Sequence, residues 1–367
     1  MVKLHRVISN KKNHLWFYLL PIIFSLIGLF FIFETSAVRS YKEIGDSFHY
    51  LRLQTIWFIL GIFLMMVLSA FDYHKLYYMA FFLMIGTIGL LFLVLIPNIG
   101  HEAGGARRWF DFGFFNIQPT ELAKFSTVIY LSSWFIQRER KRFLSFLFLL
   151  GLLMFLIILQ PNIGTAILIF FLSIVIYFIA GVEIHYLLFL IPISLGGFYF
   201  LVNISPYRFR RLLAFFNPEL DPLGITYHLN QILISLGRGG LFGVGFSESK
   251  QKYLFLPEAH TDSIFAIIAE EMGFLGSFLL ILSLMFLLYL IYRVFSNAPD
   301  RYGKLLAGGI FTFFNLQILI NLAGMVNLIP LTGTPLPFIS YGGSNLLVSF
   351  ALMGILINIY RRSKIKI

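Results

Sequence analysis

The sequence predicts an all-α protein that crosses the membrane several times. Of its 367 residues, 59% are hydrophobic and only 12% are charged, against roughly 25% charged residues in ordinary soluble domains. Phe alone accounts for 44 residues, and a water-soluble fold of this size cannot bury so much apolar side chain. The composition therefore excludes a cytosolic enzyme, a nucleic-acid-binding protein and a secreted scaffold. The chain has no Cys, which also excludes disulfides and thiolate metal sites.

Long apolar segments support this class. A spanning helix needs about 20 mostly apolar residues, and the chain offers about ten such segments, all within one membrane domain, residues 1–367. The basic N-terminal residues run into the first segment without a small-residue cleavage site, so we expect an uncleaved first span. The predicted spans are 15–34, 54–71, 76–96, 118–136, 143–159, 164–181, 186–203, 263–292, 304–325 and 343–360.

The distribution of basic residues orients these spans. Lys and Arg are about three times denser in the connecting segments on one side than on the other, and such a bias identifies the cytoplasmic side. We therefore expect both termini in the cytoplasm. A large structured extracytoplasmic loop, residues 204–262, precedes the eighth span. Within it, residues 212–216 and 229–236 are expected to form short amphipathic or re-entrant helices on the outer membrane surface.

Two groups of charged residues lie at the outward ends of early spans, where a charge within the bilayer costs about 2.5–3.5 kcal/mol. Arg107 and Arg108 precede Trp109. A guanidinium group suits phosphate, although an interfacial anchor explains these residues equally well. Glu121 and Lys124 are three positions apart and can pair on one helix face. The alternative for this pair is simple neutralisation that lowers the cost of insertion.

Three further stretches are unusually polar. Residues 160–165 form either a functional hinge or a tight turn. Residues 330–344 contain three Pro and three Gly, so they are either a rigid connector or the lining of a cavity. Residues 237–276 hold several glycines and the densest acidic cluster. There, Thr261 is a plausible N-cap that places Asp262 in the first helical turn, where the helix dipole favours an ionised carboxylate.

The predicted topology puts all five stretches on the outward side of the membrane. One outward cavity would then be lined by Arg residues that can bind phosphate, carboxylates that can transfer protons and glycines that allow close approach of the backbone. From this placement we expect a membrane enzyme or transporter that acts on an anionic, lipid-linked substrate at the outer leaflet.

The same stretches carry a resemblance to a known family. Arg107–Trp109, Gln118–Glu121, Gln160–Thr165, the LPEAHTD run at 256–262 and the PLPFISYGGS run at 335–344 resemble the SEDS family (shape, elongation, division and sporulation proteins) over nearly the whole chain. Residues 249–253 look more like the division branch, of FtsW type, than the rod-elongation branch, of RodA type.

The resemblance implies a peptidoglycan glycosyltransferase of the bacterial cytoplasmic membrane, serving cell division or cell shape. Such an enzyme polymerises lipid II into glycan strands at the outer face, usually with a class B penicillin-binding protein as transpeptidase and with other divisome or elongasome membrane proteins. Nucleic acid is not an expected partner. A lipid II flippase and a non-catalytic scaffold remain alternatives. Purified protein with lipid II in detergent separates them, since neither alternative makes strands.

The resemblance also implies roles for single residues. Asp262 is the expected general base, which activates the 4-hydroxyl of the acceptor for an inverting displacement at the donor, the growing glycan on undecaprenyl pyrophosphate. Arg107, Arg108 and Lys124 are candidates to stabilise the pyrophosphate leaving group. A divalent cation such as Mg²⁺ or Mn²⁺ is a further candidate, but no metal ligand is identified. The expected substrate-binding residues are Arg107, Arg108, Glu121, Lys124, Lys252, Glu258, His260, Ser340 and Tyr341.

The sequence departs from the family pattern at four positions in or next to these motifs. Asn162 stands where Asp is usual, which puts any role for a charge there in doubt. Thr120 and Asn345 stand where Ser is common, and Ser263 stands where Phe is common.

Overall fold

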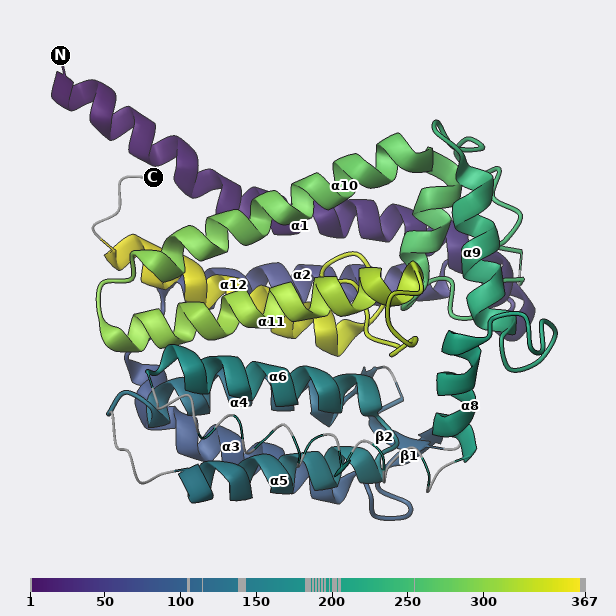
Figure 1. The fold of residues 1–367 in the computed structure, drawn as a ribbon. Helices are drawn as coiled ribbons and strands as arrows, with labels where there is room; N and C mark the ends of the chain where they lie inside the picture. Colours follow the sequence, from purple (N-terminus) through teal and green to yellow (C-terminus); the bar gives the residue numbers. More distant parts are fainter. Residues whose placement is uncertain are drawn as a thin grey trace.

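A computed structural model shows a bundle of long helices with a small sheet at one end (Figure 1). The structure describes residues 2–103, 106–113, 115–137, 143–181, 206–253 and 255–363, with single positions between 186 and 203, and side chains from residue 15 onward except 206–208. The helices are α1 (Val2–Ile44), α2 (His49–Ala70), α3 (Lys75–Leu93), α4 (Pro119–Trp134), α5 (Phe143–Leu159), α6 (Ile163–Ile179), α8 (Pro206–Phe216), α9 (Tyr227–Gly239), α10 (Ile264–Ser296), α11 (Arg301–Met325) and α12 (Gly343–Arg362). The strands β1 (His101–Ala103), β2 (Ala106–Asp111) and β3 (Asn116–Ile117) pair antiparallel in that order.

Six of the described helices are long and apolar enough to cross a membrane: the part of α1 from Leu15 to Ile44, α2, α3, α10, α11 and α12. Helices α5 and α6 are apolar but shorter. All of these, and α4, lie on segments that the sequence predicted as spans. The predicted span 186–203 falls largely outside the described residues, so the count of ten spans stays a prediction.

Two regions differ from the predicted elements. Helix α1 does not end near residue 34 but continues to Ile44, because the first residue with a helix-ending conformation is Gly45, at φ 81°. The segment between α3 and α4 contains the three strands, so the all-α prediction is wrong for this connection. Its pairing sets Trp109 opposite His101 and Phe110 opposite Ile117. The two neighbouring Arg residues are therefore held on extended, paired backbone.

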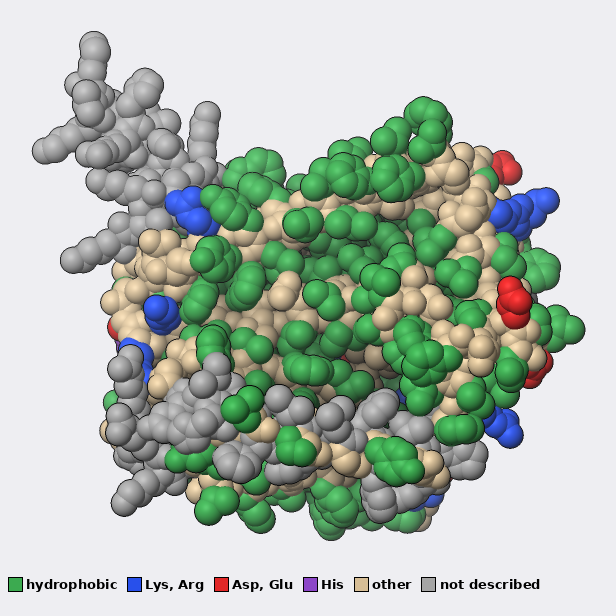
Figure 2. All heavy atoms as spheres, viewed as in Figure 1, with side chains coloured by type: hydrophobic (Ala, Val, Ile, Leu, Met, Phe, Trp, Pro, Cys, Tyr) green, Lys and Arg blue, Asp and Glu red, His purple; other side chains and the backbone are tan. Residues whose placement is uncertain are grey.

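The centre of the bundle is formed by α11 and α12. Their apolar windows are 72% and 83% buried, whereas those of the other four candidate spans are 28–44% buried. Helix α12 packs along α2, and α11 packs against α10, α6 and α4. Figure 2 shows the consequence at the surface: a broad band of hydrophobic side chains separates two ends at which Lys, Arg, Asp and Glu gather. This distribution suits a chain whose sides face lipid.

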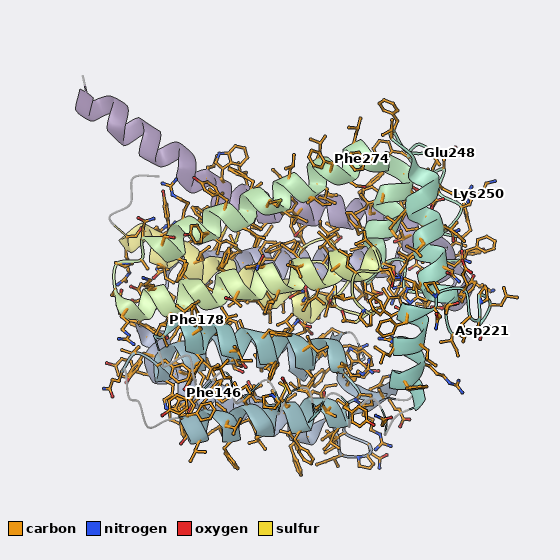
Figure 3. All side chains as sticks on the ribbon, in the orientation of Figure 1. Phe146, Phe178, Asp221, Glu248, Lys250 and Phe274 are labelled. Atoms are coloured by element: carbon orange, nitrogen blue, oxygen red, sulfur yellow. The ribbon has the colours of Figure 1, made fainter. Side chains whose placement is uncertain are left out.

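The two ends of the bundle are built differently. The start of α1 and the end of α12 lie at one end, and α8, α9 and the sheet lie at the other (Figure 1). Figure 3 shows Asp221, Glu248 and Lys250 at the α8–α9 end, whereas Phe146 and Phe178 lie along the bundle. Helices occur at both places where short amphipathic or re-entrant helices were predicted in the 204–262 segment, as α8 and α9.

A break in α10 joins the long loop to the bundle. Gly273 has φ 68° inside this helix, a conformation that costs glycine little. The loop after α9 inserts at the break: Val244 N donates to the carbonyl of Glu270 at 3.0 Å, and Phe274 N donates to the carbonyl of Gly240 at 2.9 Å. The loop thus satisfies backbone groups that the break frees. It also fixes the approach to the start of α10.

Candidate active site

Asp262 lies in a tight turn directly before α10 and is only 8% exposed. The turn closes on the carbonyl of Glu258, which accepts hydrogen bonds from the backbone N–H groups of Thr261 and Ser263. Helix α10 begins at Ile264, with Ser263 as its N-cap residue. The prediction of Thr261 as the cap, with Asp262 in the first helical turn, is therefore wrong, because the turn holds both residues before the helix.

The backbone around Asp262 is fixed by neighbours from distant parts of the chain. The side-chain amide of Asn321, on α11, donates to the carbonyls of Asp262 and Thr334, each at 2.8 Å. Thr261 Oγ1 donates to Asp262 Oδ1 at 3.3 Å. A Cβ built on Gly333 would stand 3.6 Å from Asp262 Oδ2, so the 330–344 stretch runs close beside the carboxylate.

The surroundings of Asp262 make its carboxyl group hard to ionise. Burial, assisted by the charge of Glu258 and opposed by that of Arg211, raises its pKa from an ordinary 3.8 to about 6. This direction is the reverse of the expectation from a helix dipole, because the residue lies before the helix in a desolvated turn. A pKa near neutral is suited to a group that accepts a proton during catalysis.

His260, Ser340 and Tyr341 form a wall next to this turn. The backbone N–H of Tyr341 donates to the carbonyl of His260 at 2.9 Å. The His260 ring is buried, 5.0 Å from the ring of Tyr50 and 5.5 Å from that of Tyr341. Burial lowers the pKa of His260 to about 4, so this side chain is neutral at pH 7. Ser340 Oγ accepts a hydrogen bond from Leu336 N at 2.8 Å, which folds the loop on itself.

Glu121 and Lys124 form a buried ion pair at the start of α4. Their Oε2 and Nζ atoms are 2.7 Å apart, and the side chains are only 4% and 2% exposed. The pairing predicted from their spacing is therefore confirmed. Asn345, the residue of α12 that follows the YGGS run, donates to the same Glu121 oxygen at 3.0 Å, and the ammonium of Lys124 lies 5.5 Å from the ring centre of Phe313. The pair thus joins α4 to α11 and α12.

The two arginines of β2 have different surroundings. Arg108 donates from Nε to the carbonyl of Gln160 at 2.8 Å and from Nη2 to the carbonyl of Pro161 at 2.6 Å. Arg107 pairs with Glu102 at 3.1 Å in an exposed position on the sheet. Arg108 therefore binds the polar turn between α5 and α6, whereas Arg107 faces the surface.

Further contacts connect this turn to the surroundings of Asp262. Asn162 caps α6 by accepting a hydrogen bond from Thr165 N at 3.2 Å, and its amide nitrogen lies 3.4 Å from Thr120 Oγ1. Gly164 lies against the carbonyl of Thr332, where a Cβ would overlap the oxygen. The 118–124, 160–165 and 330–344 stretches are thus in contact at one end of the bundle, as the sequence predicted from topology.

Lys252 and Glu258 differ from the other predicted substrate-binding residues in the partners of their side chains. The ammonium of Lys252 is buried and lies 3.1 Å from both Glu34, on α1, and Glu271, on α10; although burial opposes the charge, these carboxylates raise its pKa. Lys252 therefore binds the long loop to two helices. The side chain of Glu258 is 52% exposed, with Oε1 4.0 Å from Arg39. The structure does not place Lys252 against Asp262.

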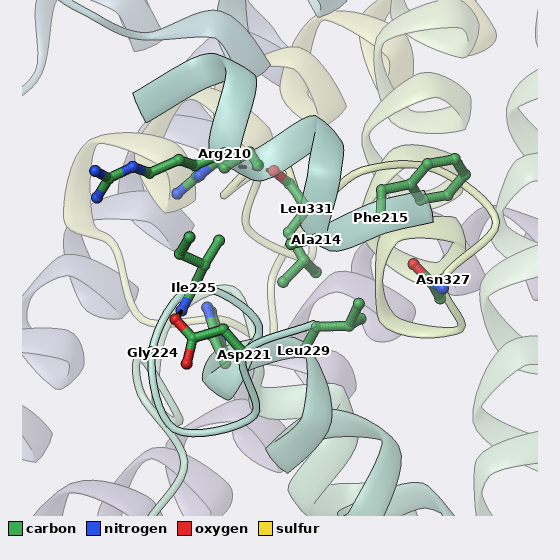
Figure 4. Close-up of a pocket in the computed structure, with 11 residues that line it drawn as sticks. Arg210, Ala214, Phe215, Asp221, Gly224, Ile225, Leu229, Asn327 and Leu331 are labelled. Atoms are coloured by element: carbon green, nitrogen blue, oxygen red, sulfur yellow. Dashed lines mark hydrogen bonds between the residues drawn. The ribbon is translucent and has the colours of Figure 1, made fainter. Parts of the chain in front are cut away.

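A cavity of about 720 Å³ opens next to this turn (Figure 4). His228 lines it, and its Nε2 atom lies 2.8 Å from Oγ of Ser263, the neighbour of Asp262. Burial lowers the pKa of His228 to about 4, so its ring is neutral. The remaining lining residues are Arg210, Arg211, Ala214, Phe215, Asp221, Gly224, Ile225, Leu229, Asn327 and Leu331.

Sequence reasoning missed Asn321 and the two arginines of the cavity. Asn321 is an amide within an apolar span, and such residues are expected to have a function or a partner. Arg210 and Arg211 are adjacent cations on the predicted outer side, as are Arg107 and Arg108, so the same pattern could have identified them. In the described part of the chain, no three His, Cys, Asp or Glu side chains are grouped to hold a metal ion.

Comparison with known proteins identifies the family. A family model described as FtsW/RodA/SpoVE cell cycle protein matches residues 13–365. The chain is 38% identical over 353 residues to Stage V sporulation protein E of Bacillus subtilis, covering 94% of this chain and 96% of that protein. It is 37% identical over 354 residues to a probable peptidoglycan glycosyltransferase FtsW of Geobacter metallireducens, with 94% of each chain covered.

Solved structures show the same fold. The match to a chain described under "Structural coordination of polymerization and crosslinking by a peptidoglycan synthase complex" has a TM-score of 0.77 and 27% identity, covering 94% of this chain and 96% of that one. The rod shape determining protein RodA of Thermus thermophilus matches with a TM-score of 0.69 and 25% identity, covering 95% and 97%. The chain therefore belongs to the FtsW/RodA/SpoVE family, the SEDS proteins, as its motifs predicted.

Proposed function

We propose that this protein is a peptidoglycan glycosyltransferase that polymerises lipid II into glycan strands at the outer face of the cytoplasmic membrane. The proposal rests on one observation above all: Asp262 is a buried carboxyl group with a pKa raised to about 6, and its neighbour Ser263 contacts His228 in the lining of a cavity of about 720 Å³. It is also supported by the printed names of relatives, several of which are probable peptidoglycan glycosyltransferases of FtsW type.

In the proposed reaction, the Asp262 carboxylate takes the proton of the 4-hydroxyl group of the acceptor sugar. The oxygen forms a bond to the anomeric carbon of the donor, and the bond from that carbon to the lipid pyrophosphate breaks. The leaving pyrophosphate keeps the electron pair, and the α linkage inverts to β. General-base catalysis of this kind contributes typically 10²–10⁴-fold to the rate.

The remaining candidates contribute to this proposal in two ways. His260 and Tyr341 shape the wall next to Asp262, and Ser340 fixes the loop that carries Tyr341. The Glu121–Lys124 pair, Arg108 and Asn162 hold together the stretches that frame the site. Arg107, on the exposed face of the sheet, is a candidate contact for the pyrophosphate of an approaching lipid.

The chain is a multi-pass membrane protein, and we infer ten spans with both termini in the cytoplasm. The described helices and the density of basic residues in the short connecting segments support this topology. We further infer a class B penicillin-binding protein as transpeptidase partner. In support, one structural relative is described as part of a complex that coordinates polymerization and crosslinking.

The test is a polymerisation assay with the purified full-length protein, lipid II and the transpeptidase partner in detergent. We expect glycan strands, whose length is read on gels. A flippase needs two membrane sides, and a scaffold makes no bonds, so either would give no strands. Absence of strands with a correctly folded complex would therefore contradict the proposed enzyme.

A further inference from the structure

The cavity next to Asp262 is built mainly by the segment between residues 206 and 229. Helix α8 contributes Arg210, Arg211, Ala214 and Phe215, and a turn from Asp221 to Ile225 forms a second side (Figure 4). The connection after α11 closes the third side. Its volume of about 720 Å³ lies within the range of small-molecule sites, about 300–1,000 Å³.

The charged groups of this cavity favour an anion. Arg210 and Arg211 are exposed on α8 and line it together. Arg211 is oriented by a hydrogen bond from Nη1 to the carbonyl of Leu331 at 3.0 Å. The carboxylate of Asp221 accepts a hydrogen bond from Ile225 N at 3.2 Å, and His228 is neutral. A guanidinium group presents a planar fork of donors that matches the geometry of phosphate oxygens.

The rest of the lining is apolar, which indicates an anion attached to a hydrocarbon. Ala214, Phe215, Leu229 and Leu331 contribute this surface. Helix α8 carries Arg residues together with Leu212, Leu213 and Phe216, as helices at a membrane surface do. A prenyl chain can therefore pass from the cavity towards lipid, while its phosphates stay at the arginines.

Two contacts place the cavity against the proposed base. His228 contacts Ser263, which follows Asp262. Leu331 is two residues before Gly333, the residue that lies beside the Asp262 carboxylate. Asp262 itself does not line the cavity, but its neighbour Ser263 contacts the lining residue His228.

We propose that this cavity, through Arg210 and Arg211, binds the pyrophosphate of the lipid-linked donor. The assignment rests on the proposed function. The donor is favoured over the acceptor because its pyrophosphate is bonded directly to the reacting carbon, which must come within about 3–3.5 Å of the oxygen that Asp262 activates. The pyrophosphate of the acceptor is separated from its reacting 4-hydroxyl by a disaccharide. A site next to the base therefore suits the leaving group.

The experiment measures binding of farnesyl pyrophosphate, a short prenyl pyrophosphate, to the purified full-length protein in detergent by calorimetry. We expect wild type and Asp262→Asn to bind equally, because binding does not need the base. Arg210→Gln should weaken the affinity about 10- to 100-fold, the usual effect of losing charge-assisted bonds. Arg210→Lys should lie between them, because it keeps the charge but not the planar fork. Lys250→Gln, an exposed residue of the same outward loop, is the matched control and should leave the affinity unchanged.

Equal affinity of wild type and Arg210→Gln, or no binding to wild type, would overturn the proposal. A second arm uses phosphatidylglycerol and inorganic pyrophosphate as competitors. Arg210-dependent binding of phosphatidylglycerol as tight as that of farnesyl pyrophosphate would identify a general phospholipid site and also overturn it. Strand synthesis tells failure of this proposal from failure of the proposed function. If Arg210→Gln makes strands at the wild-type rate, only the role of the cavity is contradicted. If the wild type binds the probe through Arg210 but makes no strands, the proposed function is contradicted.

Discussion

The side-chain amide of Asn321 donates a hydrogen bond to the backbone carbonyl of Asp262 at 2.8 Å. Its second hydrogen bond, to Thr334 at 2.8 Å, makes one buried side chain on α11 a bridge between the two loops that meet at the site. The carbonyl of Asp262 would otherwise be free to enter the hydrogen-bond pattern of α10. Asn321 is therefore a positioning residue, which sets where the carboxylate stands without touching the substrate.

Replacing Asn321 by Leu should lower the polymerisation rate at least about tenfold, because two buried carbonyls lose their donor at about 1–3 kcal/mol each. Asn358→Leu is the matched control: Asn358 is also a buried amide, but it donates to Ser69 on α2, away from the site. Thermal unfolding of both variants should be lowered, while only Asn321→Leu should move the acid limb of the pH–rate profile. An identical profile for the two variants would show that Asn321 has a merely structural role.

The pKa of Asp262, raised by burial to about 6, predicts how the rate depends on pH. A base must be ionised, so kcat/KM should fall about tenfold between pH 7 and pH 5 as the carboxylate takes up a proton. His260 and His228, with pKa values lowered by burial to about 4, stay neutral over this range. The limb should consequently keep its position in His260→Gln, whatever that change does to the absolute rate. Loss of the limb in His260→Gln would instead assign it to the histidine.

The same raised pKa predicts the stability of Asp262→Asn. Burial disfavours the charged carboxylate in the folded state, so the wild type binds the proton more tightly when folded than when unfolded. Relative to the uncharged Asp262→Asn variant, the wild type is therefore most stable below pH 4, and it loses this stability as the pH rises through 6. A difference of about two pKa units corresponds to about 3 kcal/mol. Thermal unfolding in detergent should show Asp262→Asn melting above wild type at pH 8, with the gap closing towards pH 4. Equal melting at pH 8 would indicate a hydrated Asp262.

The buried pair at the start of α4 predicts strong coupling between two substitutions. Glu121→Gln leaves the Lys124 ammonium buried without its counter-charge and should lower the free energy of unfolding by about 3–5 kcal/mol. Adding Lys124→Met removes the stranded charge and should restore most of that loss. Glu102→Gln, which breaks the exposed pair with Arg107, should cost at most about 1 kcal/mol. A double variant no more stable than Glu121→Gln alone would argue against the buried pair.

The sequence predicted the membrane class, the family and the grouping of most motif residues, because apolar segments and basic flanks are properties of single stretches. It also predicted the Glu121–Lys124 pair, since three positions on a helix fix their distance. It did not predict the helix start after Asp262, where the backbone carbonyl is bonded to Asn321, a residue far away in the sequence. The cavity was equally invisible, since it needs α8 folded back against the loop before α12. Lys252 was grouped with the site, although Glu34, far away in the sequence, decides where it lies.

The central claim is that Asp262 accepts the proton of the attacking hydroxyl group. Its most direct test compares strand synthesis from lipid II by Asp262→Asn and by wild type, each with the transpeptidase partner in detergent. Gel filtration and thermal unfolding verify the fold of the variant. We expect a rate at least about 10²-fold lower in a protein that is folded and still binds its partner. A rate equal to wild type would contradict it.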